Sequence, residues 1–459
     1  MDLHVALPSG RSCLVSMGPD ATLGDLKVAA QKALQKGFLR LVIHGRVRED
    51  FECHLSKVGL EHGQVVYAIV QTPQLAASFQ AFALWCCGGG CVTWGHPGYG
   101  GDSSAVQEEL RMKGVQHIEA SKHAFAALLS DGSVVAWGDP GYGGDCSQVK
   151  EQLKNVCQVK GTGCAFAAVR QDGGVVTWGH PMLGGDMSAV QDQLNDIKEI
   201  EASDGAFAAL RCDGGVVTWG EAWFGSDSSA VQDRLQNVQQ LQSSHGAFTA
   251  ILADGAAISW GPVKHGGDSR AVQARLRRVR SVRSSGSAFA ALVEEGGRVS
   301  VVTWGHPTCG GDSGHVQDRL QNVQQIVGAG SAFAALLADG KVVTWGHPML
   351  GGDSSSVALC DVQNIFGSCH AFSAIRADGT VVTWGHEDRG GDCSQVSERL
   401  HEVLQICGSY NRFAAVTAAG DVVTWGLEEL ENDNSSAQER RKRFQQVRSV
   451  DDVPGLELL

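Results

Sequence analysis

Apolar and polar positions follow a unit that recurs about every 41 residues along most of the chain. In 332–346, for example, Ala-Phe-Ala-Ala-Leu-Leu precedes Asp339-Gly340, and Val-Val-Thr-Trp-Gly comes after it. Two short apolar runs around Asp-Gly predict a β-hairpin, because this pair readily takes the positive backbone angles of a tight turn. An aliphatic residue seven positions before the Phe, such as Ile326, is followed by small residues and predicts a third strand that ends in a tight bend.

Two aromatic columns mark nine copies of this unit. A Trp-Gly pair recurs at intervals of 39 to 44 residues, at Trp94, Trp137, Trp178, Trp219, Trp260, Trp304, Trp345, Trp384 and Trp425. A Phe stands 12 residues before each Trp, or 15 before it in the sixth copy, at Phe82, Phe125, Phe166, Phe207, Phe248, Phe289, Phe333, Phe372 and Phe413. A three-stranded unit cannot bury its own apolar face, so we predict that these aromatic side chains form the structural core between neighbouring units.

A polar turn and a second apolar pattern follow each Trp-Gly. An Asp stands eight residues after every Trp, from Asp102 to Asp433, and apolar residues follow 12, 16 and 19 residues after the Trp, as in Val231, Leu235 and Val238. This spacing predicts a short amphipathic helix of two to three turns between units. The Asp, or the residue next to it, is expected to cap the helix N-terminus.

These elements predict a mainly β fold, a β-propeller of about nine three-stranded blades with short inter-blade helices over residues 74–450. One closed ring is the preferred interpretation, with the strand-like segment 444–447 pairing near Leu75 to seal it. A seven-bladed ring with two irregular copies, or an open spiral, remains an alternative. Residues 451–459 are expected to form a C-terminal tail.

Residues 1–73 lack the repeat and predict a small separate α+β domain. Apolar runs predict strands at 3–7, 12–16, 39–46 and 64–70. Between the second and third strands, a helix is predicted over 22–34, with Thr22 as its N-cap.

Composition narrows the class of protein. The chain has 459 residues, 59 of them Gly, and a net charge of -13, which disfavours binding to nucleic acid through neutralised phosphates. The basic run 440–443 is too short to reverse this balance, and we interpret it as a solvated helix face. The N-terminus lacks a secretory pattern and no window is apolar enough to span a membrane, so we expect an intracellular protein of the cytoplasm or nucleus with no membrane partner.

Candidate reaction chemistry is sparse. His follows Trp by two residues at His96, His180, His306, His347 and His386, but in a ring these side chains would lie one blade apart, too far to share a metal ion. The Gly-Gly pairs match no phosphate-binding motif, and no nucleophile motif is present. The 14 cysteines are expected to be reduced and mostly buried. We therefore expect no enzyme activity, no catalytic or metal site and no cofactor.

The repeat resembles a known family. Ala-Phe-x-Ala-Leu-x-x-Asp-Gly-x-Val-Val-Thr-Trp-Gly resembles the repeats of the regulator of chromosome condensation family over about 74–450. The resemblance implies a propeller that binds a protein partner. The family usually has seven blades and a Gly-Gln-Leu-Gly segment, which Gly-Gly-Asp-Ser and the predicted helix replace here.

The N-terminal segment looks like a ubiquitin-like β-grasp domain, with Pro19, Thr22, Leu23 and Gly45-x-x-x-Glu49-Asp50 at comparable places. The resemblance implies an apolar receptor-binding patch at Pro8, Val42 and Ala68. It does not imply a conjugated modifier, because the segment continues through Pro73 into the first repeat instead of ending in Gly-Gly.

Together these features predict a non-catalytic protein–protein interaction scaffold. The propeller would bind a protein partner, and the ubiquitin-like head would link it to ubiquitin-pathway proteins. One alternative is a substrate-recognition component of a ubiquitin ligase. A second is a guanine nucleotide exchange factor for a small GTPase, which the family resemblance implies.

Overall fold

The computed structural model describes residues 1–48, 51 and 53–427. Its first sheet contains β1 (Asp2–Ala6), β2 (Ser12–Ser16), β3 (Leu39–Ile43), β4 (Arg46–Arg48) and β5 (Val65–Val70), in the order β2-β1-β5-β3-β4. The β1 and β5 strands are parallel and the other pairs are antiparallel. Two helices belong to this part, α1 (Leu23–Leu34) and α2 (Leu55–Val58).

Helix α1 begins where its sequence predicts. The Thr22 side chain accepts a hydrogen bond from the Asp25 backbone, and the Asp25 side chain accepts one from the Thr22 backbone, so the predicted N-cap is confirmed. Leu26 and Ala30 of α1 are buried in a core with Leu3, Leu41 and Val66 of the sheet. This core gives the N-terminal part a packed interior of its own.

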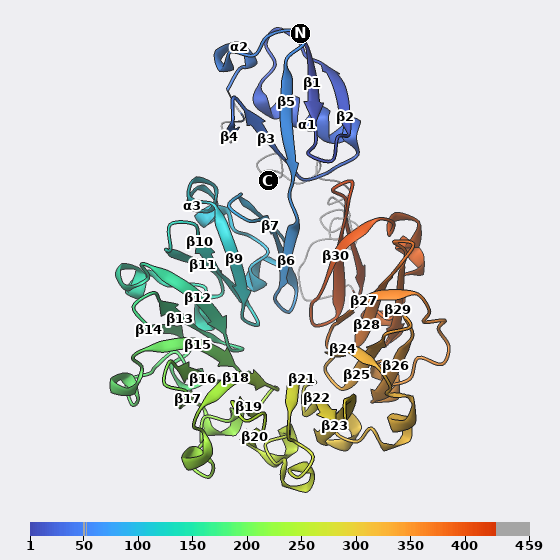
Figure 1. Cartoon of the computed structure of the whole chain (residues 1–459). Helices are drawn as coiled ribbons and strands as arrows, with labels where there is room; N and C mark the ends of the chain where they lie inside the picture. The colour runs from blue at the N-terminus through green and yellow to red at the C-terminus, as the bar shows by residue number, and fades with distance from the viewer. Residues whose placement is uncertain (49–50, 52, 428–459) are drawn as a thin grey trace, which may run out of the picture.

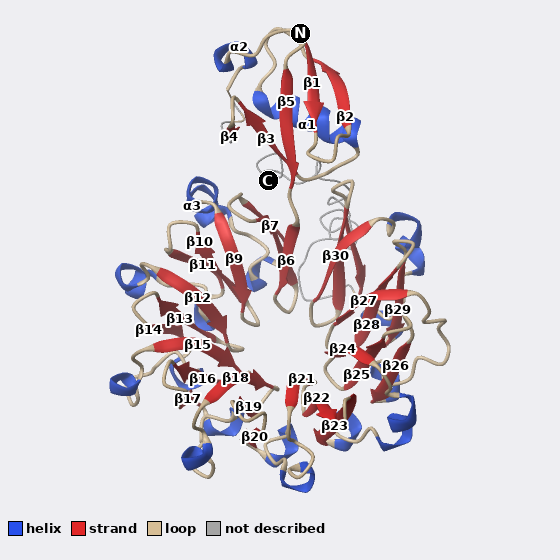
Figure 2. Cartoon of the chain, viewed as in Figure 1, coloured by secondary structure: helices blue, strands red, loops and turns tan. Residues whose placement is uncertain are grey.

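Within the described residues, the repeats form nine three-stranded antiparallel sheets, which we call blades (Figures 1 and 2). The predicted mainly β fold of repeated three-stranded sheets is confirmed. The strands, blade by blade, are β6 (Pro73–Ala77), β7 (Ala81–Cys86), β8 (Cys91–Gly95); β9 (Val115–Ala120), β10 (Ala124–Leu129), β11 (Val134–Gly138); β12 (Val156–Gly161), β13 (Ala165–Arg170), β14 (Val175–Gly179); β15 (Ile197–Ala202), β16 (Ala206–Arg211), β17 (Val216–Gly220); β18 (Val238–Ser243), β19 (Phe248–Leu252), β20 (Ala257–Trp260); β21 (Val279–Ser284), β22 (Ala288–Glu295), β23 (Arg298–Gly305); β24 (Val323–Gly328), β25 (Ala332–Leu337), β26 (Val342–Gly346); β27 (Val362–Gly367), β28 (Ala371–Arg376), β29 (Val381–Gly385); and β30 (Val403–Gly408), β31 (Arg412–Thr417), β32 (Val422–Gly426).

The blades follow one another around a ring, with the first strand of each blade innermost (Figure 1). The last blade meets the first, because β30 packs against β6. One core cluster joins Ala414 and Val416 of the last blade to Phe82 and Trp94 of the first. The described residues therefore close the ring directly. The segment 444–447, predicted to seal it, lies outside the described residues, as do the basic run 440–443 and the tail 451–459.

The Phe and Trp of each blade stack on one another, and the Trp also contacts the preceding blade. In all nine blades the Phe and Trp rings stack with centroids 5.1–5.5 Å apart. The Trp indole also donates across the boundary, as from Trp178 Nε1 to the Gly143 carbonyl of the preceding blade's loop at 3.0 Å. Two blades differ: Trp304 donates to Ser259 Oγ, and buried Trp94 has no hydrogen-bond partner among the described residues.

The turns explain why Asp-Gly recurs. Asp172 accepts from the Gly174 backbone at 3.0 Å, and Gly173 takes a φ of 77°, while the Asp itself stays outside the left-handed region. Blade six has longer hairpin strands, and there Gly296 and Gly297 both have positive φ, 58° and 80°. Two consecutive positive angles define a tight two-residue hairpin turn that matches the strand twist.

The predicted inter-blade helices are wrong in length. Among the described repeats only α3 (Gln107–Lys113) is α-helical; six of the other segments contain a 3-10 helix of three or six residues, and the segment 353–361 contains no helix. The third apolar residue of the predicted stripe, such as Val238, is the first residue of the next strand, which leaves room for one or two turns. The 3-10 helices are η1 (Pro97–Tyr99), η2 (Ser104–Val106), η3 (Pro140–Tyr142), η4 (Ser147–Gln152), η5 (Pro181–Leu183), η6 (Gln191–Gln193), η7 (Ala222–Phe224), η8 (Gln232–Arg234), η9 (Val263–His265), η10 (Arg270–Val272), η11 (Pro307–Cys309), η12 (Gly314–Arg319), η13 (Pro348–Leu350), η14 (Glu387–Arg389) and η15 (Ser394–Arg399).

The Asp column still fixes the start of these segments. In all eight described copies, the Asp side chain accepts from the backbone N–H two residues ahead, as Asp186 does from Ser188 at 2.9 Å. Hydrogen bonds from the Ser188 backbone and side chain lower the pKa of Asp186 below its ordinary value. Asp433 lies outside the described residues.

The N-terminal part contacts both blades at the ring closure (Figure 1). Phe38, 2% exposed, belongs to the core cluster shared by the first and last blades. The Gly37 backbone donates to the Ala418 carbonyl of blade nine at 2.9 Å, and Arg40 Nη2 donates to the Gly88 carbonyl of blade one at 2.7 Å.

All 14 cysteines are free thiols, but they are distributed over buried, half-buried and exposed positions, so the expectation of mostly buried thiols is wrong. Cys157 and Cys212, for instance, are exposed. In the described part of the chain, none of the helices has the length and apolar content needed to cross a bilayer.

Candidate functional site

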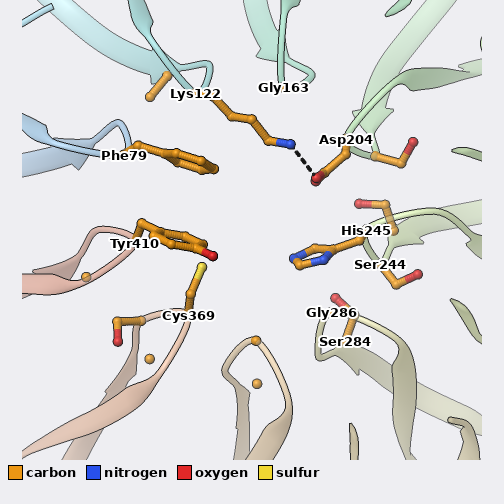
Figure 3. A pocket seen from close by; sticks show the side chains of 18 of the residues that line it. Phe79, Lys122, Gly163, Asp204, Ser244, His245, Ser284, Gly286, Cys369 and Tyr410 are labelled. Carbon is orange, nitrogen blue, oxygen red and sulfur yellow. Dashed lines mark ion pairs between the residues drawn. The ribbon is translucent and has the colours of Figure 1, made fainter. Parts of the chain in front are cut away.

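A cavity of about 790 Å³ lies on the ring axis, lined by the bends that follow the innermost strands of the nine blades (Figure 3). A buried hydroxyl fixes most of these bends. Ser203 Oγ donates to the Phe224 carbonyl at 2.7 Å and accepts from the Ala206 backbone at 3.1 Å. The cavity wall is therefore tied to the loop that follows the Trp of the same blade.

One residue from each bend, three positions before the repeat Phe, reaches the cavity. Neighbouring bends are joined by backbone hydrogen bonds, from Phe79 N to Lys122 O at 3.0 Å through Gly286 N to Gly330 O at 2.9 Å. This chain of bonds holds the backbone in place while the side chain is free to vary. The nine residues are Phe79, Lys122, Gly163, Asp204, His245, Gly286, Gly330, Cys369 and Tyr410.

An ion pair between blades two and four forms the charged side of the cavity. Lys122 Nζ lies 2.9 Å from Asp204 Oδ2, and the intervening bend presents only Gly163 (Figure 3). Burial acts to lower the pKa of Lys122, but the attraction of Asp204 and its hydrogen bond outweigh burial and raise that pKa. The ammonium also lies 5.6 Å from the centroid of the Phe79 ring, within cation–π range.

The side of the cavity next to Lys122 is aromatic. Phe79 and Tyr410 stack with centroids 4.6 Å apart across the ring closure, and His370 Nδ1 lies 2.9 Å from the Tyr410 carbonyl. Tyr410, His245 and Cys369 point into the cavity from three directions (Figure 3). Burial raises the pKa of the Cys369 thiol to about 11, so the thiol is protonated at neutral pH and is a poor nucleophile.

This arrangement suits binding. Asp204 offers an acceptor and Lys122 a donor, both on bends joined by backbone hydrogen bonds, and Tyr410 adds an aromatic face and a hydroxyl. Among the residues that the structure describes, no three His, Cys, Asp or Glu side chains are grouped to hold a metal ion.

The structure corrects the patch inferred for the N-terminal part. Pro8 is exposed and Val42 is half-buried, but Ala68 is fully buried in the core. Strand pairing places Val42 opposite Tyr67 and Leu41 opposite Ala68. Because successive strand residues point to opposite faces, the outward neighbour of Val42 is Tyr67, which is 59% exposed.

The aromatic columns do not line the cavity. All nine Phe and all nine Trp are at most 9% exposed, and their stacked rings lie within and between blades. Two of the five His that follow the repeat Trp form hydrogen bonds within their own loops: His96 Nδ1 accepts from the Gly98 backbone at 3.1 Å, and His306 Nδ1 lies 2.9 Å from Thr308 Oγ1. Among the described residues, the buried Nδ1 atoms of His347 and His386 have no hydrogen-bond partner.

Sequence reasoning did not find the cavity residues. A signal was present, since the slot three residues before Phe varies from Gly to Lys, Asp and Tyr inside bends that are otherwise small and similar. A variable column within a uniform repeat marks a position that packing does not determine.

The fold and the axial cavity place the chain in the class of β-propeller repeat proteins. No protein-family model matches the chain, and no curated protein matches its sequence. Similar solved structures include the ectodomain of the receptor kinase CR4 of Physcomitrella patens, 15% identical, covering 59% of this chain and 73% of that chain at a TM-score of 0.39. Prp20p of Saccharomyces cerevisiae, solved in a study of its binding to Gsp1p and histones, is 15% identical over 83% of this chain and 97% of that chain, with a TM-score of 0.38. Human WBSCR16 is 14% identical over 69% and 88%, with a TM-score of 0.37.

Proposed function

We propose that this chain is a non-catalytic protein–protein interaction scaffold whose propeller binds a protein partner over the mouth of the axial cavity. The observation that carries the proposal is the set of nine bends around one cavity, of which six present side chains that differ from one another and three present Gly. A fixed backbone with variable side chains provides specificity without reorganisation on binding. The raised pKa of Cys369 and the pairing of Lys122 with Asp204 favour recognition over catalysis.

Exposed apolar side chains on the loops next to the bends also support a protein partner. The loops after the repeat Trp lie beside the bends, as the bond from Ser203 to Phe224 shows. These loops expose Met182, Trp223 and Met349 by 66%, 56% and 68%. Met and Trp are enriched at the cores of protein interfaces.

The second part of the proposal concerns residues 1–73. The sheet order β2-β1-β5-β3-β4 with one long helix on one face supports a ubiquitin-like β-grasp head. Its outer face exposes Val65, Tyr67 and Ile69 on the central strand β5. We place the link to ubiquitin-pathway proteins on this face, with Val42 and without Ala68.

Affinity capture from source cells tests the proposal with the full chain. The variant F79S/Y410S removes the aromatic wall of the cavity, Y67E charges the outer face of the head, and M112E adds a charge at a 70% exposed site on α3 as the control. We expect F79S/Y410S to lose the propeller partners and Y67E to lose a separate set that includes ubiquitin-pathway proteins. Identical captured sets for all three variants would contradict both parts.

The captured proteins also separate the two alternatives. A catalytic ligase subunit lost only with Y67E would favour the ligase-component hypothesis. A small GTPase lost with F79S/Y410S, whose nucleotide release is accelerated by the wild-type chain, would favour nucleotide exchange and overturn the non-catalytic proposal.

A further inference from the structure

Arginine is concentrated in the sixth repeat. Residues 270–298 contain seven Arg and two Glu, in a chain whose net charge is -13. Six of these Arg fall within 270–283, a stretch without Asp or Glu. The local charge is therefore opposite to that of the whole chain.

Three neighbouring slots carry Arg in this repeat alone, at Arg277, Arg278 and Arg280. The copies before and after have uncharged amides at the same slots, namely Gln236, Asn237 and Gln239, and Gln321, Asn322 and Gln324. Amides at these slots are evidently sufficient to build a blade, so the fold does not require the positive charges.

Arg278 also has a backbone conformation that a long side chain disfavours. It has a φ of 55°, in the left-handed region. Five other copies place Asn or Asp in the same conformation, and the ninth copy places Glu402 there with a φ of 48°. The five are Asn155, Asp196, Asn237, Asn322 and Asp361. These short polar residues tolerate the left-handed region best, whereas a long side chain with a Cβ is disfavoured there. Arg278 therefore occupies a slot where most copies carry a short polar residue, so the turn itself does not select an arginine.

The arginines form one exposed surface at the end of blade six. Arg277, Arg278 and Arg280 are exposed just before and at the start of β21, and Arg298 is exposed beside the turn of the long β22–β23 hairpin. We call these four residues the arginine surface. Glu294 lies 3.0 Å from Arg280 and neutralises part of its charge. The axial cavity is at the other end of β21, where Ser284 lines it.

We propose that the arginine surface binds an acidic segment of a partner protein. Planar guanidinium groups bind carboxylates through paired hydrogen bonds, and several such groups at one place select a run of Asp or Glu. A short acidic segment fits this local surface. A long nucleic acid would extend over a remainder of the chain whose net charge, without these four residues, is -17, from -13 minus 4. This surface is separate from the cavity, so the inference goes beyond the proposed function.

A fluorescein-labelled decaglutamate peptide tests the inference by fluorescence anisotropy with the full chain at low salt. The variant R277Q/R278N/R280Q restores the residues of the neighbouring copy, so it should fold and melt at or above the wild-type temperature. The control K154Q/K198Q/R234Q removes three exposed positive charges from other blades. We expect the first variant to bind decaglutamate about tenfold more weakly and the control to change affinity less than about twofold.

Other outcomes would overturn the inference. Equal losses in both triple variants would mean that only net charge matters, and absence of saturable binding by the wild type would remove the site. Tighter binding of a ten-nucleotide single-stranded DNA, lost in the same variant, would reassign the surface to nucleic acid. The cavity variant F79S/Y410S should bind decaglutamate as the wild type does, which keeps this test independent of the proposed function.

Discussion

At the scale of single residues, the repeat Trp combines two contacts that differ in kind. Its ring stacks on the Phe of its own blade, and its indole N–H reaches the preceding blade, as in the 3.0 Å bond from Trp345 to the Gly310 carbonyl. Trp94 keeps the stacking contact but has no hydrogen-bond partner among the described residues. Comparing Trp94 with Trp345 therefore separates ring packing alone from ring packing with a buried hydrogen bond.

We predict that Trp345→Phe lowers the free energy of unfolding by about 1–3 kcal/mol more than Trp94→Phe does. Both substitutions keep an aromatic ring, but only the first leaves the buried Gly310 carbonyl without its donor. Urea unfolding of both variants measures the difference. Equal losses at the two positions would show that the inter-blade hydrogen bond contributes nothing beyond ring packing.

Residue identity alone could not place every side chain. Val42 and Ala68 both follow an alternating strand pattern, but which face each occupies depends on the register between β3 and β5. A shift of one residue moves a side chain from the surface to the core, so Ala68 was assigned to a surface that Tyr67 occupies.

At the scale of elements, the hairpin turns have three solutions in one chain. Six blades use an Asp whose side chain accepts from the backbone and a Gly with positive φ. Blades one and nine keep the Gly, at Gly88 and Gly420, without the Asp, and blade six uses Gly296 and Gly297, both with positive φ. The position of the inserted residues at this turn follows from the longer gap between the sixth Phe and Trp. The short 3-10 segments were not foreseeable from periodicity, because the strand that follows takes over the last apolar position of the stripe.

Gly296 offers a clean test of the blade-six turn. No atom lies within 4 Å of a Cβ placed there, so a substitution reports the backbone angle alone. We predict that Gly296→Asn is neutral to within about 0.5 kcal/mol, because Asn tolerates a φ near 58°. Gly296→Val should lose about 1–2 kcal/mol, because a β-branched residue is strained in the left-handed region. Thermal melting of both variants distinguishes them, and a melting temperature shared by the two would contradict the two-residue turn.

At the scale of the whole molecule, the closing point of the ring is also the docking point of the N-terminal part. Phe38 is inserted into the core shared by blades one and nine, and hydrogen bonds from Gly37 and Arg40 reach one blade each. A ring of separate sheets is weakest where the chain does not connect neighbours, since only packing holds that boundary. The N-terminal part therefore stabilises the contact between blades one and nine.

We predict that Phe38→Ala destabilises the closure by about 3–4 kcal/mol, the usual cost of removing a buried aromatic ring. Hydrogen exchange followed by mass spectrometry should show faster exchange in β6–β8 and β30–β32, with β15–β20 unchanged. The control Tyr67→Ala removes an exposed ring from the same domain and should leave all blades protected. Uniform acceleration around the ring, or none at the closure, would contradict this stabilising role.

The sequence by itself determined the nine repeats, their strands, the aromatic columns and the turn residues, because each depends on spacings within about 41 residues. Tertiary structure alone decided which residues meet on the axis, since Phe79 and Tyr410 stack although 331 positions separate them. It also decided the strand register that buries Ala68 and the insertion of Phe38 at the ring closure. Local patterns encode which face of a strand is apolar, but the partner that covers the face is set only when the blades close around a common axis.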